Sequence, residues 1–407
     1  MDGRAGRSSR AAALVVIGFL SAFAPLATDL YLPAMPALGD AFAAPEELTQ
    51  ATLAACFLGI ALGQLVWGPV ADRAGRRVPI LLGVAAFTIA SLVCALSPTI
   101  EVFIVARFVQ GLAGAAGIVI GRAVLRDWYA GADLSRILAR LLLVSGSAPV
   151  IAPMLGGALL QLTDWRGTFW ALLALGAALL VATWLAVPES LPAERRLRGR
   201  AARAGAWIAL ARHPVFMLFA LVQAVAMSTV FTYITFAPHV FVVERGVPDW
   251  LFALLFGVNA IGLVAGGQVS AALVRRAGAG RLIVIGLAVD LAASALALAC
   301  GAFGWPTWLL CVALFVVMAA TGLVLPNATA LALEPFRSGA GTASAVVGAA
   351  QFLAAGTVPL AFGAVLGVTG SAMGAGMIIS SVVAIALLAI AWWRRRGEPR
   401  TLEPASD

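Results

Sequence analysis

The chain has 407 residues, of which 62% are hydrophobic and 11% are charged, and its formal net charge is +8. Ordinary globular proteins are about a quarter charged, so this composition excludes a large soluble α/β protein. All 27 basic residues are arginines. Without lysine there is no phosphate-binding loop ending in Lys-Ser/Thr and no lysine Schiff base, which excludes an ATP pump made from this chain alone and a pyridoxal phosphate or retinal protein.

Twelve runs are apolar and long enough to cross a bilayer, which takes about 20 mostly apolar residues. The first run reaches Leu32 and is longer than a signal-peptide core, so we expect it to be retained. The predicted spans are Ala12–Leu32, Thr49–Ala71, Pro79–Leu96, Val102–Leu125, Leu138–Leu160, Thr168–Pro188, Val215–Val242, Trp250–Val274, Leu282–Phe303, Thr307–Leu333, Thr342–Gly367 and Ser371–Trp393.

The arginines lie mainly between these runs, as topology signals do, and not in a nucleic-acid-binding patch. With the amino terminus in the cytoplasm, 23 arginines face the cytoplasm and only Arg166 and Arg245 face outward. We therefore predict an all-α membrane protein with twelve transmembrane helices in two pseudo-symmetric six-helix bundles and both termini cytoplasmic. The expected bundles are 1–188 and 214–407, the second with a short cytoplasmic tail, and residues 189–213 form a cytoplasmic linker.

The two halves repeat weakly. Ala61-Leu62-Gly63 with Asp72-Arg73-Ala74-Gly75 recurs 203 residues later as Val264-Ala265-Gly266 with Arg275-Arg276-Ala277-Gly278. Both copies end the second helix of a half, which indicates the parallel repeats of a six-plus-six transporter. Because Arg275 replaces the acid, we do not expect the two loops to be chemically equivalent.

Two opposite charges lie inside predicted spans, where ionisable residues are costly and usually functional. Asp29 in the first span and Arg107 in the fourth both fall roughly 6–9 Å below the outer boundary, at about 1.5 Å per residue. Matching depth predicts that they pair. A carboxylate whose proton affinity changes as the site closes and dries is what proton coupling requires. The alternative is a static ion pair that only fixes helix packing.

The short loop between the second and third spans combines glycines, one acid and arginines. It makes its flanking helices antiparallel, and the acid can accept hydrogen bonds or cap a helix at the membrane face. We predict a conformational gate here; the alternative is a turn-stabilising acid. The gate residues are Gly68, Asp72, Arg73, Gly75, Arg76 and Arg77.

The fifth span contains a proline–glycine motif at helical spacing. Proline breaks the hydrogen-bond ladder of a helix, and glycine narrows it, so this helix should be bent and closely packed. The motif residues are Gly146, Pro149, Pro153, Gly156 and Gly157.

These motifs together resemble those of the major facilitator superfamily. Gly68-Pro69, Asp72-Arg73 and Gly75-Arg76-Arg77 are similar to its loop 2–3 motif, Arg107 with Gln110-Gly111 to its helix 4 motif, and Gly146 through Gly157 to the helix 5 motif of its antiporters. Asp29-Leu30-Tyr31-Leu32-Pro33-Ala34-Met35-Pro36 and Arg122-Ala123-Val124-Leu125-Arg126-Asp127 resemble the bicyclomycin/chloramphenicol-resistance (Bcr/CflA) branch. The resemblance covers essentially the whole chain.

The resemblance implies a proton-coupled multidrug efflux antiporter of the bacterial inner membrane, exporting hydrophobic or amphenicol/bicyclomycin-like drugs by rocker-switch alternating access. Asp29 would bind the proton and Arg107 would bias that binding. Asp72 would tie the second helix to the start of the eleventh, where Gly339, Gly341 and Thr342 offer free amides. The alternative is a proton-coupled exporter of an endogenous metabolite, such as an amino acid or a sugar.

The family's cavity-facing helices suggest substrate contacts, with simple packing as the alternative for each residue. These candidates are Tyr31, Gln110, Gln223, Tyr233 and Asn327. An enzyme is not expected, because the spans hold no convergent nucleophile–base or metal-ligand groups. We expect no cofactor and no metal, a proton gradient as the driving force, a monomer, and small molecules, protons and lipid as partners. Asp290, in the middle of the ninth span, has no role that the sequence explains.

Overall fold

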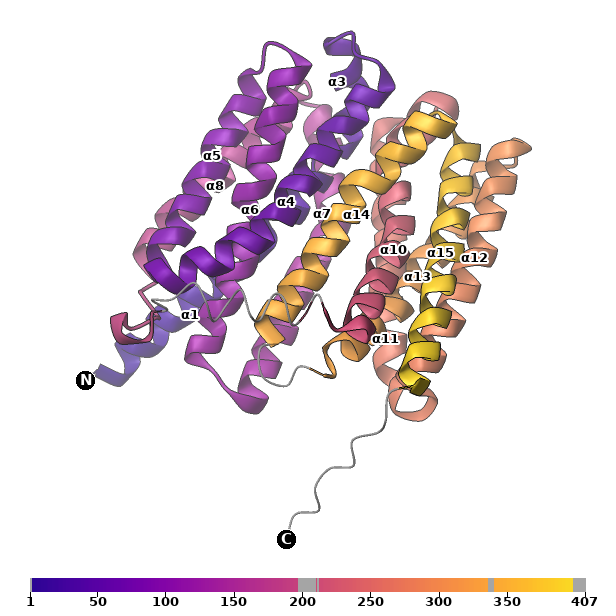
Figure 1. The fold of residues 1–407 in the computed structure, drawn as a ribbon. Coiled ribbons are helices and arrows are strands. Elements are labelled where there is room, and N and C mark those ends of the chain that lie inside the picture. Colours follow the sequence, from indigo (N-terminus) through magenta and orange to yellow (C-terminus); the bar gives the residue numbers. More distant parts are fainter. Residues whose placement is uncertain (1, 197–209, 211, 336–339, 398–407) are drawn as a thin grey trace.

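The computed structural model describes residues 2–196, 210, 212–335 and 340–397. This part of the chain is helical and contains no strand. Its long helices lie side by side (Figure 1), and eleven helical segments are long and apolar enough to cross a membrane. A shorter apolar stretch, Ser147–Leu160, lies in another long helix. The predicted all-α membrane protein is confirmed.

The helices of the first half are α1 (Asp2–Ser21), α2 (Phe23–Asp29), η1 (Leu32–Ala34), α3 (Met35–Ala41), α4 (Glu46–Ala74), α5 (Arg77–Leu96), α6 (Ile100–Trp128), α7 (Gly131–Leu160), α8 (Arg166–Ala186) and η2 (Ala193–Arg195). Those of the second half are α10 (Pro214–Pro238), η3 (His239–Glu244), α11 (Asp249–Ala277), α12 (Ala279–Ala302), α13 (Thr307–Leu333), α14 (Ala340–Leu366) and α15 (Gly370–Gly397).

The first membrane-length segment runs over Ala11–Ala41, past the predicted end at Leu32, and it is not one continuous helix. It divides into α1, α2, η1 and α3, and prolines stand in three of these pieces at Pro25, Pro33 and Pro36. Proline removes an amide donor and clashes with the carbonyl four residues earlier, so closely spaced prolines break a helix. The break places Asp29 at the last turn of α2 and Tyr31 just before η1.

Glycines allow the same close helix contacts in both halves. A Cβ at Gly59 of α4 would lie 2.1 Å from a backbone carbonyl of α6, and one at Gly262 of α11 would lie 2.7 Å from a backbone carbonyl of α13. Gly75 and Gly278 both adopt positive φ, +91° and +80°, directly after these helices. Gly59 and Gly262 are 203 residues apart, as are Gly75 and Gly278, and this is the offset of the sequence repeat. The repeat therefore corresponds to the same helix packing and the same turn in both halves.

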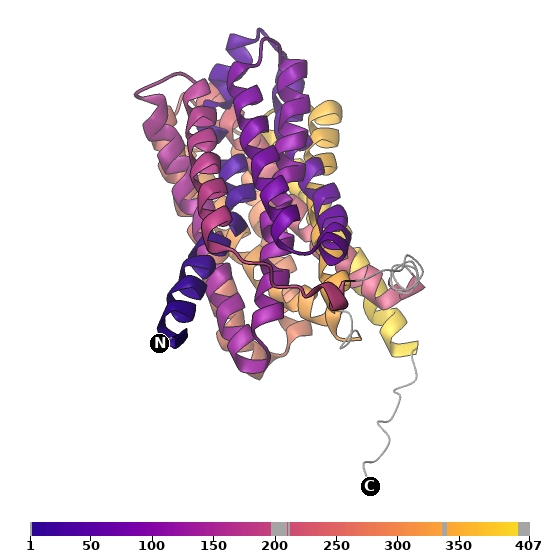
Figure 2. The same ribbon diagram turned by 90° about the vertical axis from the view of Figure 1, so that its left-hand side faces the viewer.

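The helices of the first half gather on one side of Figure 1 and those of the second half on the other, with α14 against α4 where they meet. A second contact joins α7 to α11. Figures 1 and 2 both show α1 beginning and α15 ending at the same end of the molecule. The α4–α5 loop, with Gly75 and Arg76, also lies toward that end, which we call the loop end (Figure 1).

Candidate functional site

Arg107 connects α6 to the broken first span. Its guanidinium is fully buried, and Nη1 donates hydrogen bonds to the Ala27 carbonyl at 2.8 Å and to Gln110 Oε1 at 2.5 Å. The guanidinium carbon lies 4.3 Å from the centre of the Tyr31 ring, within the range of a cation–π contact. Ala27 is in the last turn of α2, where carbonyls lack helical partners, so the break after α2 makes this acceptor available.

Asp29 is buried near this guanidinium but is not paired with it. The residue is 4% exposed, and its carboxyl accepts a hydrogen bond from Thr28 Oγ1 at 3.0 Å. Both residues are described, and no ion pair joins Asp29 to Arg107. The predicted pairing is therefore wrong in this conformation, in which the guanidinium bonds the Ala27 carbonyl and Gln110 through Nη1. Their assignment to proton coupling stays a prediction.

The five predicted substrate contacts are buried and hydrogen-bonded within their own half of the chain. Tyr31 shares a hydrogen bond with Thr52 (2.9 Å), Gln110 donates to Ser91 (2.8 Å), Gln223 donates to Gln351 (3.2 Å), Tyr233 accepts from Asn259 (3.1 Å) and Asn327 donates to Ser270 (2.7 Å). Each side chain is thus satisfied by a neighbouring helix in this conformation, and a role in substrate binding stays a prediction.

Three phenylalanines pack across the two halves. The ring centre of Phe57 on α4 lies 4.7 Å from that of Phe231 on α10 and 6.1 Å from that of Phe352 on α14, and the latter two are 5.9 Å apart. No spacing pattern links three single phenylalanines on three helices, so the cluster could not be found without the fold.

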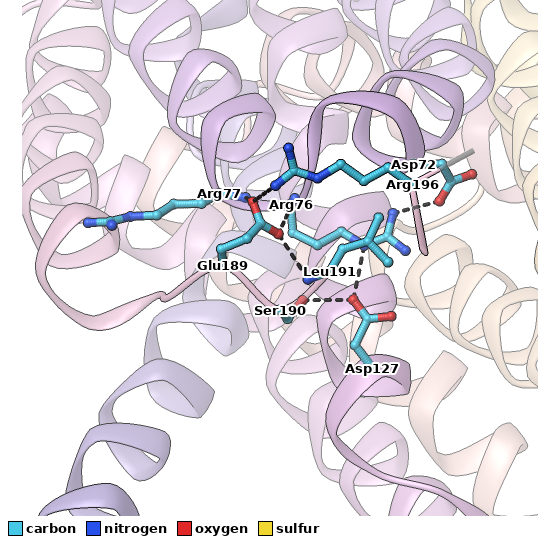
Figure 3. Close-up of polar contacts among 8 residues, drawn as sticks. All are labelled: Asp72, Arg76, Arg77, Asp127, Glu189, Ser190, Leu191 and Arg196. Carbon is cyan, nitrogen blue, oxygen red and sulfur yellow. Dashed lines mark hydrogen bonds and ion pairs between the residues drawn. The ribbon is translucent and has the colours of Figure 1, made fainter. Parts of the chain in front are cut away.

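At the loop end, Arg76 joins the predicted gate to the end of α6. Its guanidinium is bound by Asp72 at 2.6 Å and by Asp127 at 3.0 Å, and Asp127 also accepts a hydrogen bond from Ser190 Oγ at 2.7 Å (Figure 3). Partial burial alone would lower the pKa of Arg76, but the hydrogen bonds and charges of the two aspartates raise it above its ordinary value. We call Arg76 and these carboxylates the Arg76 cluster.

Glu189, in the segment after α8, caps the start of α5. Its carboxylate accepts backbone hydrogen bonds from Arg76 at 2.8 Å, from Arg77 at 3.3 Å and from Leu191 at 3.0 Å (Figure 3). Arg196 lies 3.7 Å away. Partial burial raises the pKa of Glu189, but these amides and Arg196 outweigh it and hold the pKa below its ordinary value. A carboxylate at a helix amino terminus also suits the helix dipole.

Gly75 has to be glycine beside this cap. Its φ is +91°, and a Cβ there would lie 2.3 Å from Glu189 Oε2. A Cβ at Gly68, by contrast, would lie 3.8 Å from its nearest neighbour, the Val119 side chain. The Arg73 side chain is exposed. Sequence reasoning found the gate loop but missed Glu189, whose available signal was a single acid directly after the sixth span.

A cavity of about 170 Å³ opens beside Asp72 between α4, α6 and α14. Its polar lining residues are Gln64, Asp72, Arg76, Arg122, Arg126, Thr342 and Ser344. Asp72 and Thr342 therefore border the same space, as an interaction with the start of α14 requires. Of the predicted amide donors, Gly339 lies outside the described residues and the surroundings of Gly341 are not described.

The helix 5 motif lies where α7 contacts both halves. A Cβ at Gly156 would lie 1.9 Å from the Leu30 carbonyl, and one at Gly157 would lie 2.9 Å from the Ala253 side chain of α11. Pro149 and Pro153 lie within the same helix, and the surroundings of Gly146 are outside the described residues. The motif thus allows α7 to approach the first span and α11 at once.

Comparison with known proteins identifies the family. The model of the Major Facilitator Superfamily matches residues 17–359. "Uncharacterized MFS-type transporter YdgK" of Bacillus subtilis (strain 168) is 33% identical over 377 residues, covering 92% of this chain and 94% of the relative. "Bicyclomycin resistance protein homolog" of Haemophilus influenzae is 27% identical, covering 83% and 85%, and "Chloramphenicol resistance protein" of Pseudomonas aeruginosa is 33% identical, covering 63% and 61%.

Among solved structures, a D-xylose-proton symporter has the same fold, with a TM-score of 0.74 at 15% identity, covering 92% of this chain and 96% of the symporter. The protein is therefore a multi-pass membrane transporter and not an enzyme. The chain belongs to the major facilitator superfamily, with relatives in its bicyclomycin/chloramphenicol-resistance (Bcr/CflA) branch.

Proposed function

We propose that this chain is a proton-coupled multidrug antiporter of the bacterial inner membrane, which exchanges an inward proton for an outward hydrophobic or amphenicol/bicyclomycin-like drug. The names of its bicyclomycin- and chloramphenicol-resistance relatives favour this substrate class. The chain contains both halves of the carrier, so it acts as a monomer. The proton gradient drives it, with no cofactor.

The observation that carries this proposal is the buried carboxyl of Asp29. It lies at a break in the first span, its hydrogen-bond partner is the Thr28 hydroxyl, and Arg107 is bonded two residues earlier in the chain. A carboxyl that is dry and lacks a cationic partner is far more stable when it carries a proton. Once the site opens to water, hydration stabilises the carboxylate and favours proton release. This difference between conformations couples the proton to the cycle.

The arrangement of the halves supports alternating access. We propose two six-helix bundles, 1–188 and 214–407, that rock about the α4–α14 and α7–α11 contacts, with the linker 189–213 and both termini in the cytoplasm. Away from the loop end, Glu46 and His239 meet across the halves with 3.2 Å between Oε2 and Nδ1. At the loop end, the Arg76 cluster and the cavity beside it form the second gate. The two gates open alternately as the bundles rock.

The proposal is tested with inverted membrane vesicles carrying an imposed pH gradient. Chloramphenicol should release protons from vesicles that contain the wild-type carrier, as read by a pH-sensitive dye, and amino acids and sugars should not. Asp29→Asn should lose this release, and Asp133→Asn is its matched control, because Asp133 is an exposed acid paired with Arg136. Proton release by an amino acid or a sugar, with none by chloramphenicol, would instead support the metabolite exporter.

A further inference from the structure

A second carboxyl is buried in the other half of the chain. Asp290 lies in the middle of α12 and is 1% exposed. Its Oδ2 is 2.6 Å from Ser381 Oγ on α15 and 3.4 Å from Thr229 Oγ1 on α10. Its Oδ1 has no hydrogen-bond partner in the described part of the chain. Three helices therefore meet at one carboxyl whose hydrogen-bond partners, among the described residues, are hydroxyl groups.

In the part of the chain that the structure describes, no cation balances this carboxyl, and Asp290 takes part in no ion pair. The titratable or charged residues described on α12 and on the helices packed against it are Arg281 and Cys300 on α12, Tyr233 on α10, Asp249, Arg275 and Arg276 on α11, Cys311 on α13 and Arg394 on α15. An ionised carboxylate at this site would lack compensation, which favours its neutral form.

The hydroxyl hydrogens around Asp290 indicate where a proton sits. Ser381 Oγ has one hydrogen but lies within hydrogen-bond distance of two acceptors, Asp290 Oδ2 and the Met377 carbonyl at 2.9 Å. A carbonyl can only accept. If Asp290 is protonated, it donates to Ser381, which donates to Met377, and both contacts are satisfied. If it is ionised, Ser381 must turn its hydrogen away from Met377.

Asp29 has the same arrangement in the first half. Thr28 Oγ1 lies 3.0 Å from the Asp29 carboxyl, 2.9 Å from the Pro25 carbonyl and 3.2 Å from the Ala24 carbonyl, so its single hydrogen has three acceptors within reach. Each half thus holds one buried carboxyl beside a hydroxyl that already faces a helix carbonyl. In each half, the hydroxyl can hydrogen-bond both the carboxyl and a helix carbonyl only when the carboxyl itself supplies a hydrogen.

We propose that Asp290 is a second proton-binding site, which binds and releases a proton reversibly and is linked to α10 through Thr229. That helix also carries Phe231, two residues further on, which packs on Phe57 of the first half. A proton at Asp290 therefore acts on a helix that contacts both halves. A role of this proton in transport rests on the proposed function, whereas its binding does not.

Infrared spectroscopy of the purified carrier in lipid nanodiscs tests the proposal without any substrate. The carbonyl stretch of buried carboxylic acids is recorded from mildly acidic to alkaline pH. Wild type should show a band that Asp290→Asn removes and that disappears in alkali. Thr229→Val and Ser381→Ala keep the carboxyl and should each shift the frequency of this band. Asp133→Asn, the exposed control, should leave it unchanged.

Several results would overturn the site. One is a spectrum of Asp290→Asn identical to wild type at every pH, and another is an Asp290 band that persists unchanged in alkali. A band lost on adding sodium chloride at constant pH would show that the carboxyl binds a sodium ion and not a proton. No frequency shift in Thr229→Val would show that Thr229 does not contact the carboxyl. If Asp290→Asn misfolds, the frequency shifts in the two hydroxyl variants still decide the question. The spectrum of Asp29→Asn is recorded in parallel. If Asp29→Asn loses no carboxylic acid band, the result counts against the proposed function but not against the Asp290 site.

Discussion

The guanidinium of Arg107 donates its 2.8 Å hydrogen bond to the carbonyl oxygen of Ala27, two residues before the buried carboxyl of Asp29. The same nitrogen also binds Gln110, while Nε and Nη2 have no partner within the described residues. Arg107 therefore holds the broken first span against α6 and keeps two donors unused beside the proposed proton site.

Arg107→Lys should fold but transport poorly. Lysine keeps the charge but lacks the planar guanidinium that bonds Ala27 and Gln110 while lying over the Tyr31 ring. Loss of one hydrogen bond to a charged group, about 1.5–3 kcal/mol, corresponds to roughly 10- to 100-fold slower exchange. The rate of chloramphenicol-driven proton release in vesicles measures this, with Arg136→Lys as the exposed control. A wild-type rate for Arg107→Lys would show that the guanidinium geometry is not needed.

The two gate glycines should respond differently to alanine. Gly75→Ala places a side chain at positive φ and against Glu189, which should cost about 1–2 kcal/mol from the backbone alone and displace the cap on α5. Gly68→Ala meets no close neighbour and removes a flexible residue from α4, so it should be neutral or slightly stabilising. Thermal unfolding in detergent compares them. Equal destabilisation by the two changes would contradict this account of the loop.

Glu189 should make stability depend on pH in acid but not near neutrality. Its folded-state pKa lies below its ordinary value, which is about 4.3, so its contribution is complete above that pH and is lost as the pH falls through the folded pKa. Glu189→Gln should cost about 1 kcal/mol at neutral pH, since the carboxylate is partly exposed. The difference in unfolding temperature between the two proteins should shrink in acid; a difference that stays constant in acid would refute the cap.

A cross-link between positions 46 and 239 should stop transport. Glu46 and His239 meet across the halves in this conformation, and rocking of the bundles has to separate them. The double variant Glu46→Cys/His239→Cys, treated with a cleavable bifunctional thiol reagent, should lose exchange and recover it after cleavage. Each single cysteine variant is a control for modification alone, since the native Cys56, Cys94 and Cys300 are buried and Cys311 is half-buried. Undiminished transport in the cross-linked protein would argue against alternating access through this contact.

The sequence predicted the membrane spans well because bilayer thickness sets a length that local composition reveals. It also predicted that Arg107 lies level with Asp29, since Arg107 reaches Ala27 in the same turn of α2 as Asp29. The predicted ion pair between Asp29 and Arg107 was wrong. Closely spaced prolines break the first span and free the Ala27 carbonyl, which accepts a hydrogen bond from the Arg107 guanidinium. A regular helix drawn from the sequence has no such acceptor.

Other features depend on how segments that are distant in the sequence pack together, so they could not be predicted from the sequence. Glu189 caps α5 only because the segment after α8 folds back on the loop end. The five polar candidates faced packed neighbours because the rotation of each helix about its own axis, which decides what a side chain faces, is set by tertiary contacts. Asp290 was visible as an anomaly, but its hydroxyl partners come from α10 and α15.

The central claim, that the carboxyl of Asp29 carries an exchanged proton, is tested most directly by counting protons when chloramphenicol binds to the purified carrier. The measurement uses weakly buffered solution and a pH indicator, with binding followed in parallel. We predict that Asp29→Asn binds chloramphenicol as wild type does but releases fewer protons for each drug bound. An unchanged number of released protons in Asp29→Asn would contradict the account.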